Sequence, residues 1–164
     1  MLVGVISDTH DNLPAIRAAL DVFARRGAGA VLHAGDFVSP FALKMFLNLD
    51  APFFGVLGNN DGEREGLRAL CPALKEGPYR FELGDRIAVM AHKESDLDGD
   101  VVRGADLCIF GHSHRPDIRA GRPLAVNPGE CGGWLSGRRT VALVDLAAME
   151  GEIVDIGLQE TVQP

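Results

Sequence analysis

Cysteine and long hydrophobic runs are both scarce in this sequence. The three cysteines among 164 residues, Cys71, Cys108 and Cys131, form no Cys-x-x-Cys pair. A disulfide framework is therefore not expected, and the thiols fit a reducing compartment. The apolar run after Met1 is far shorter than the ~20 residues of a membrane span, and no basic region or cleavage site of a signal peptide accompanies it. We expect a cytoplasmic protein with no membrane partner.

Basic clusters are short as well. None exceeds the pairs Arg25-Arg26 and Arg138-Arg139, and the formal net charge is −7. Broad binding to nucleic acid needs concentrated positive charge, so this class of partner is not expected. The charge count omits bound cations, which can make the field at a site positive while the rest of the surface stays negative.

Length and composition predict a single domain over residues 1–164. With 46% hydrophobic residues, a chain of this size buries about 70% of its unfolded surface and needs no metal or disulfide merely to hold its fold. No internal repeat, low-complexity tract or linker divides the chain.

The first apolar run, residues 2–6, predicts a strand that is buried on both faces in a largely parallel sheet. The chain then reaches Asp8 and His10. Residues two apart on an extended chain project to the same side, so both can face one point beyond the strand's carboxyl end, where open α/β sheets bind ligands. An oxygen donor and a nitrogen donor at this spacing suit a first-row transition metal.

Helices are predicted after the first and second strands. Asn12 can cap a helix that Gly27 and Gly29 end. A strand over residues 30–33 then runs into Asp36, which brings a second carboxylate to the same edge. Pro40 opens a second helix, whose inward-facing residues are predicted to be Phe41, Met45, Phe46 and Leu49.

A third strand is predicted over residues 53–57, and Asn59 follows it. Three successive strand-helix units with polar groups at the strand ends imply a right-handed parallel sheet with a polar crevice along one edge. The second half of the sequence has a different pattern of predicted elements. It begins with an antiparallel hairpin that ends at His92, followed by a short helix over residues 96–102. Brief strands are predicted over residues 107–110, near Ile118, and over residues 124–126, 140–144 and 152–156. We expect two packed sheets with helices outside.

Metal-binding side chains follow the ends of these strands: Asp8, His10, Asp36, Asn59, His92, His112 and His114. Seven donors are too many for one tetrahedral zinc and suit two metals that share a bridging carboxylate. Taken alone, His112 and His114 would be interpreted as surface-loop residues, and Asp8 as a helix cap. Their convergence with the other donors at one sheet edge favours a metal site.

Other conspicuous residues have plainer interpretations. His33 has apolar neighbours and is interpreted as a hydrogen-bonded buried residue rather than a ligand. Asp61 is interpreted as the cap of a helix that begins near Gly62. Trp134 and Leu135 lie among glycines and either form a subunit contact, which would make the protein a homo-oligomer, or cover the core.

The order of these motifs resembles that of the calcineurin-like metallophosphoesterases. The matching blocks are Asp8-Thr9-His10, Gly35-Asp36, Gly58-Asn59-Asn60-Asp61, His92 and Gly111-His112-Ser113-His114. The short length and Asn127-Pro128-Gly129 resemble the small bacterial and archaeal phosphodiesterase branch. No single block is specific, but five blocks in the family's order are. The resemblance implies an α/β fold, a four-layer αββα sandwich of two mixed sheets flanked by helices.

The resemblance also implies a ligand set. One divalent metal would be held by Asp8, His10, Asp36 and His114, and a second by Asp36 as the bridge with Asn59, His92 and His112. Asp36, Asn59 and His92 are further expected to take part in catalysis. Manganese is the expected metal, with nickel, iron or zinc as alternatives.

The expected function is a two-metal phosphodiesterase that acts on a small phosphodiester. Two divalent cations bring four positive charges, and Asp8 and Asp36 are the only anionic ligands. A bridging hydroxide that attacks phosphorus in line with the leaving group removes one more charge, which leaves one to attract a phosphodiester anion. The alternative is a non-catalytic interaction scaffold of the same fold. The His-x-His pair also suggests a barrel amidohydrolase, but that fold needs about 250 residues.

Three positions depart from the family pattern. Asn60 stands where many members have a histidine that protonates the leaving oxygen, and an amide cannot do this. Lys93 replaces a glycine after His92, so the local backbone is expected to differ. Glu130 replaces a serine, and the sequence assigns it no role.

Overall fold

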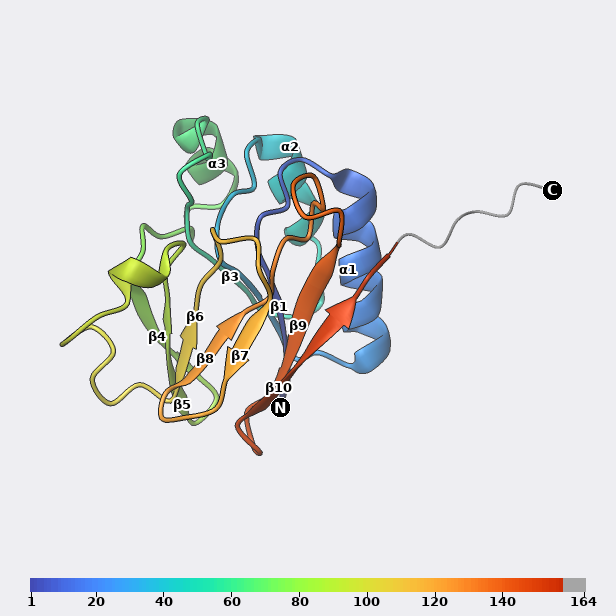
Figure 1. Cartoon of the computed structure of the whole chain (residues 1–164). Coiled ribbons are helices and arrows are strands. Elements are labelled where there is room, and N and C mark those ends of the chain that lie inside the picture. The colour runs from blue at the N-terminus through green and yellow to red at the C-terminus, as the bar shows by residue number, and fades with distance from the viewer. Residues whose placement is uncertain (158–164) are drawn as a thin grey trace.

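The computed structural model describes residues 1–157, which form two five-stranded mixed sheets packed face to face (Figure 1). The first sheet has the order β10-β9-β1-β2-β3 and the second the order β4-β5-β6-β8-β7. The strands of the first sheet are β1 (Leu2–Ile6), β2 (Ala30–His33), β3 (Phe53–Gly55), β9 (Thr140–Asp145) and β10 (Glu150–Asp155). Those of the second are β4 (Tyr79–Leu83), β5 (Arg86–Met90), β6 (Leu107–Ile109), β7 (Asp117–Arg119) and β8 (Leu124–Asn127). The predicted fold class is confirmed.

Each sheet has a parallel centre. In the first sheet, β1, β2 and β3 are parallel, and β9 adds to β1 in the antiparallel direction. In the second sheet, β5, β6 and β8 are parallel, whereas β4 pairs with β5 as the predicted antiparallel hairpin. The polar segments that follow the parallel strands of both sheets therefore collect at strand ends, as open α/β sheets require of a ligand site.

The first helix forms for the local reasons expected from its ends. In α1 (Leu13–Arg26), the side chain of Asn12 accepts a hydrogen bond from the Ala15 amide at 3.2 Å, and Gly27 ends the helix with φ 70°. A Cβ atom at Gly4 of β1 would lie 2.7 Å from the Phe23 ring. The helix thus packs directly on the backbone of the central strand (Figure 1).

The second helix is shorter than expected. It comprises α2 (Pro40–Leu43) and a tighter 3₁₀ turn, Lys44–Phe46, and α3 (Arg64–Leu70) follows β3. The prediction that Phe41 faces inward is wrong, because its side chain is 52% exposed while Ala42 and Leu43 are buried. The 3₁₀ turn has three residues per turn, so a spacing of 3.6 does not describe this segment.

The hydrophobic core has a layer on each face of the first sheet, because successive side chains of a strand point to opposite faces of the sheet. Val3 and Val5 of β1 face the second sheet and pack among its inward-facing residues. Ile6 belongs instead to the buried cluster on the opposite face of the sheet, which also contains Phe23 of α1 and Leu67 of α3. The helices therefore cover the first sheet on the face opposite the second sheet. No helix in residues 1–157 is both long and apolar enough to cross a membrane.

The predicted helix over residues 96–102 is wrong. A 3₁₀ turn, Glu94–Asp96, is followed by turns, and Gly99 has φ 48°. The aspartates and glycine of this segment favour turns over helix. Its apolar side chains, among them Leu97 and Val102, still pack against Val89 and Cys108 on the outer face of the second sheet.

Candidate metal centre

The predicted ligands follow strands of both sheets. Asp8 follows β1 and Asp36 follows β2 in the first sheet, and Asn59 lies beyond β3. His92 follows β5, and both His112 and His114 follow β6 in the second sheet. The chain thus brings together side chains that are more than one hundred residues apart.

Five of these residues form two overlapping groups. In the first group, Asp8 Oδ1 lies 3.9 Å from His10 Nε2 and 3.5 Å from His114 Nε2. The second group contains Asp8, Asp36 and His92, with Asp36 Oδ2 3.3 Å from His92 Nε2. Asp36 Oδ2 also lies 3.7 Å from His10 Nε2. One carboxylate oxygen therefore stands between histidines of the two groups, as a bridging ligand would.

The burial and hydrogen bonding of these atoms fit divalent cations. Asp8 and Asp36 are fully buried. Asp8 Oδ1, His10 Nε2 and His92 Nε2 are buried and have no hydrogen-bond partner. Leaving a buried polar atom unpaired costs about 1–3 kcal/mol, so several such atoms aimed at one region indicate a missing partner. A pair of first-row divalent ions matches this mixture of oxygen and nitrogen donors.

The pKa values of the buried groups favour Asp36 as an anionic metal ligand. Burial opposes its ionisation, but the adjacent His92 ring and the hydrogen-bond donors of Asn60 outweigh burial, so the pKa of Asp36 lies well below its usual value. Burial lowers the pKa of His92, yet Asp36 and Asp8 together raise it above the ordinary value. Burial dominates at Asp8 and raises its pKa. Asp36 is thus the more strongly anionic carboxylate of the pair.

The backbone of the site is strained in a way that the sequence did not reveal. Five predicted ligands have left-handed φ values between 43° and 67°, namely Asp8, His10, Asp36, His112 and His114. The prediction that Asp8 and His10 meet is correct, but the extended geometry assumed for it is wrong, because β1 ends at Ile6. Such conformations cost about 1–3 kcal/mol each and cluster at functional sites.

Asp61 supports this strained backbone, and its interpretation as a helix cap is wrong. The helix α3 begins at Arg64 with Glu63 as its cap residue. The carboxylate of Asp61 instead accepts hydrogen bonds from the amides of Asp36 (3.1 Å), Val38 (2.8 Å) and Gly58 (2.6 Å). It therefore ties together the two loops that follow β2 and β3.

Two glycines of the motifs allow the loops to pack on the carboxylates. A Cβ atom at Gly58 would lie 2.2 Å from Asp36 Oδ1, and one at Gly111 would lie 2.7 Å from Asp8 Oδ2. Neither position has room for a larger residue. A glycine next to a predicted ligand within a motif is a sequence signal that could have indicated this close approach.

Asn59 and His112 lie at the rim rather than in the two buried groups. Both side chains are exposed, and they line one hollow of about 560 Å³. The ring centroid of His112 lies 5.1 Å from that of His92. The structure thus brings five predicted ligands into contact and leaves these two on the open side of the same site.

The departures at Asn60 and Lys93 have structural explanations. Asn60 donates to both oxygens of Asp36, from its amide N and from Nδ2, at 2.8 Å each. It therefore stabilises the central carboxylate. Lys93 has φ −101° and ψ 137°, an extended conformation that does not require glycine.

His33 has the structural role predicted for it. It is fully buried, its Nδ1 accepts a hydrogen bond from the Gly35 amide at 3.1 Å, and its Nε2 lies 3.2 Å from the Thr9 hydroxyl. Burial holds the pKa of His33 well below its ordinary value. A neutral ring therefore supports the turns that carry Asp8 and Asp36.

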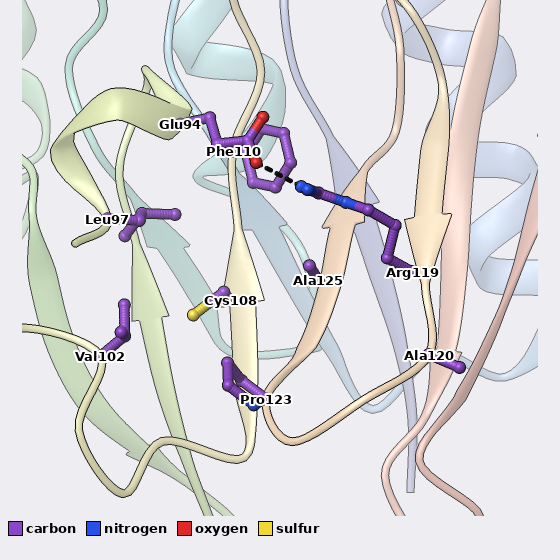
Figure 2. Close-up of a pocket in the computed structure, with 9 residues that line it drawn as sticks. All are labelled: Glu94, Leu97, Val102, Cys108, Phe110, Arg119, Ala120, Pro123 and Ala125. Carbon is purple, nitrogen blue, oxygen red and sulfur yellow. Dashed lines mark hydrogen bonds and ion pairs between the residues drawn. The ribbon is translucent and has the colours of Figure 1, made fainter. Parts of the chain in front are cut away.

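A second hollow lies on the outer face of the second sheet (Figure 2). It has a volume of about 200 Å³ and is bordered by an ion pair between Glu94 and Arg119. Arg119 also lies over the Phe110 ring, 5.4 Å from its centroid. Burial raises the pKa of the Cys108 thiol in its wall to about 11. The hollow contains none of the predicted ligands and is not the candidate site.

Comparison with known proteins decides the family. Residues 1–149 match the model of the calcineurin-like phosphoesterase superfamily domain. The chain belongs to this superfamily. The resemblance inferred from the order of the motifs is confirmed, and the buried groups around Asp8 and Asp36 lie within the matched residues of this phosphoesterase domain.

Archaeal relatives of this phosphoesterase match nearly its whole length. A phosphodiesterase of Methanocaldococcus jannaschii is 37% identical over 159 aligned positions, covering 92% of this chain and 96% of the relative. A protein of Methanothermobacter thermautotrophicus named "Probable metallophosphoesterase" is 34% identical over 176 aligned positions, covering 100% of this chain and 95% of the relative. The solved structure of an archaeal phosphodiesterase superposes with a TM-score of 0.83 at 34% identity, covering 94% of this chain and 99% of that one.

Proposed function

We propose that this calcineurin-like phosphoesterase is a two-metal phosphodiesterase that acts on small phosphodiesters. The observation that carries the proposal is the position of Asp36 Oδ2, 3.7 Å from His10 Nε2 and 3.3 Å from His92 Nε2. A shared carboxylate between two sets of nitrogen ligands is what a binuclear centre requires. The archaeal phosphodiesterases that resemble this chain support the choice of diester substrates.

The proposed ligand sets extend the two buried groups by the rim residues. Asp8, His10, Asp36 and His114 hold the first metal, and Asp36, Asn59, His92 and His112 hold the second. Manganese is the proposed metal, with nickel, iron or zinc as alternatives. When bound, the two cations supply Lewis-acid polarisation of the phosphate and a water whose pKa falls to about 7.

The chain's own residues define what surrounds the reacting phosphate. Arg115 is exposed and lines the same hollow as Asn59 and His112, so its guanidinium adds positive charge where a diester anion would enter. Asn60 is engaged with Asp36 and carries no proton that it could transfer at neutral pH. Displacement at phosphorus is proposed to run in line with the leaving group, which departs without protonation by Asn60.

The test compares bis(p-nitrophenyl) phosphate with p-nitrophenyl phosphate. The protein is stripped of metal, and manganese, nickel or zinc is returned singly, with the metal content measured in each sample. Metal-dependent turnover that favours the diester is the expected result. Full metal loading without turnover of either ester would contradict the proposal and favour the non-catalytic scaffold.

The three cysteines support the proposal of a cytoplasmic location. Cys71, Cys108 and Cys131 are all buried and unpaired. Free thiols persist in reducing compartments, whereas oxidising ones favour disulfides.

A further inference from the structure

Glu130, to which the sequence assigned no role, is a fully buried carboxylate beside the metal centre. Its Oε1 lies 3.4 Å from Nδ1 of His114, whose Nε2 faces Asp8. That Nδ1 atom is buried and has no hydrogen-bond partner. A histidine that binds a metal through one ring nitrogen usually donates its other N–H to an acceptor such as a carboxylate, which fixes the ring's orientation. Glu130 is placed to do this.

The same carboxylate holds a loop. It accepts hydrogen bonds from the amides of Trp134 at 2.7 Å, Leu135 at 3.0 Å and Ser136 at 2.9 Å, and from the Ser136 hydroxyl at 2.8 Å. Burial alone would raise the pKa of Glu130, but these donors and His114 lower it below the ordinary value. Through these contacts Glu130 connects the backbone of residues 134–136 to a predicted metal ligand.

Further contacts bind this loop to the ligand segment after β1. The indole Nε1 of Trp134 donates to the His10 carbonyl at 3.1 Å. The Gly132 amide donates to the Asp8 carbonyl at 3.0 Å, and its own carbonyl accepts a bond from Asn12 Nδ2 at 2.7 Å. The loop is thus fixed to both sides of the first proposed metal site.

The loop borders the hollow over the metal centre. Leu135 and Ser136 line it together with Asn59, Asn60 and His112. Its volume of about 560 Å³ lies within the range of small-molecule sites. Leu135 is 79% exposed and Trp134 is 63% exposed, so neither covers the core. An exposed leucine in the wall of an otherwise polar hollow offers apolar surface to a ligand.

We propose that residues 132–136 form the specificity wall for the ester group that the diester retains, and that Glu130 is the positioning residue that ties this wall to His114. The wall takes an aryl or planar heterocyclic group against Leu135 while the phosphate faces the metal ligands. The proposal rests on the proposed phosphodiesterase function.

Two diesters with the same leaving group test the wall: phenyl p-nitrophenyl phosphate and methyl p-nitrophenyl phosphate. Leu135→Ser should raise KM for the phenyl ester about tenfold, as the loss of one apolar contact does, with an effect on the methyl ester at least about fivefold smaller. Leu47→Ser, an exposed leucine outside the hollow, is the matched control. Equal effects on both esters, or a smaller oligomeric mass for Leu135→Ser than for the unaltered protein, would overturn the assignment of Leu135 to a specificity wall.

A binding measurement keeps the test independent of turnover. Trp134 is the only tryptophan in the chain, so its emission reports on the loop directly. Diphenyl phosphate should bind zinc-loaded protein more tightly than dimethyl phosphate and change this emission, and Leu135→Ser should remove the preference. If the protein hydrolyses neither ester yet binds diphenyl phosphate more tightly than dimethyl phosphate, the phosphodiesterase proposal is wrong and the proposed specificity wall is supported. Equal binding of both diesters by the unaltered protein overturns the wall.

Zinc affinity tests the positioning role without any substrate. Glu130→Gln should weaken zinc binding by about 10–100-fold, the usual cost of losing a carboxylate partner of a ligand histidine, and should shift the Trp134 emission. Glu82→Gln, an exposed site on β4, is the matched control. If Glu130→Gln does not fold, Ser136→Ala removes only the hydroxyl donor and should weaken zinc binding less. Unchanged zinc affinity in the folded variant would overturn the role of Glu130.

Discussion

Oδ2 of Asp36 lies 3.3 Å from Nε2 of His92, although Asp36 follows β2 in the first sheet and His92 follows β5 in the second. The contact therefore depends on how the two sheets pack. Leu32 of β2 and Met90 of β5 belong to the buried layer between the sheets, which sets their separation. The packing of the hydrophobic core therefore sets the geometry of the candidate metal centre.

Asp61→Ala should destabilise the protein by about 3 kcal/mol, because three amides lose their acceptor and each buried unpaired donor costs about 1–3 kcal/mol. Urea denaturation measures this change in the free energy of unfolding. Asp21→Ala, on the exposed face of α1, is the control and should change stability by less than about 0.5 kcal/mol. A loss at Asp61 no larger than at Asp21 would show that its three hydrogen bonds do not support the loops.

The rate of diester hydrolysis should depend steeply on the leaving group. Asn60 is held by Asp36 and cannot protonate a departing oxygen. General acid catalysis contributes about 10²–10⁴-fold, so p-nitrophenyl esters should react at least about 100-fold faster than alkyl esters. A series of aryl and alkyl diesters under single-turnover conditions measures this slope. A flat dependence would mean that another group supplies the proton.

The Cys108 thiol should react slowly in the folded protein. Its pKa is raised to about 11 by burial, so the thiolate is about 0.1% populated at pH 8. Alkylation by iodoacetamide should be at least ~100-fold slower than in urea and should rise about tenfold per pH unit while the fold persists. Peptide mapping by mass spectrometry follows Cys108 separately from the other two thiols. Equal rates in the folded and unfolded protein would contradict the burial argument.

Local chemistry explains which parts of the fold were predictable. Asn12 and Gly27 are signals that act within one turn of their own helix, and α1 has the bounds they indicate. The hairpin of β4 and β5 follows equally from alternation around a turn. The segment after His92 failed because its apolar residues pack on the second sheet as a series of turns around Gly99. Spacing alone does not distinguish these turns from a short helix.

The sequence predicted which residues come together in the site, but not which residues hold them in place. Asp36 and His92 were expected together because each ends a strand, and the structure places them in contact. The roles of Asp61 and Glu130 depend on backbone amides that a residue pattern does not display. The left-handed φ of Asp8 was equally hidden, because tertiary hydrogen bonds rather than the residue type impose it.

Metal stoichiometry tests whether Asp36 bridges two metal ions. The unaltered chain and Asp36→Asn are each stripped, loaded with manganese, freed of excess metal and analysed by elemental mass spectrometry. We expect two metal ions per unaltered chain, and at most one per Asp36→Asn chain together with a rate of diester hydrolysis at least about 100-fold lower. Asp21→Asn should behave as the unaltered protein. Unchanged metal content and rate in Asp36→Asn would contradict the bridging role of this carboxylate and with it the two-metal site.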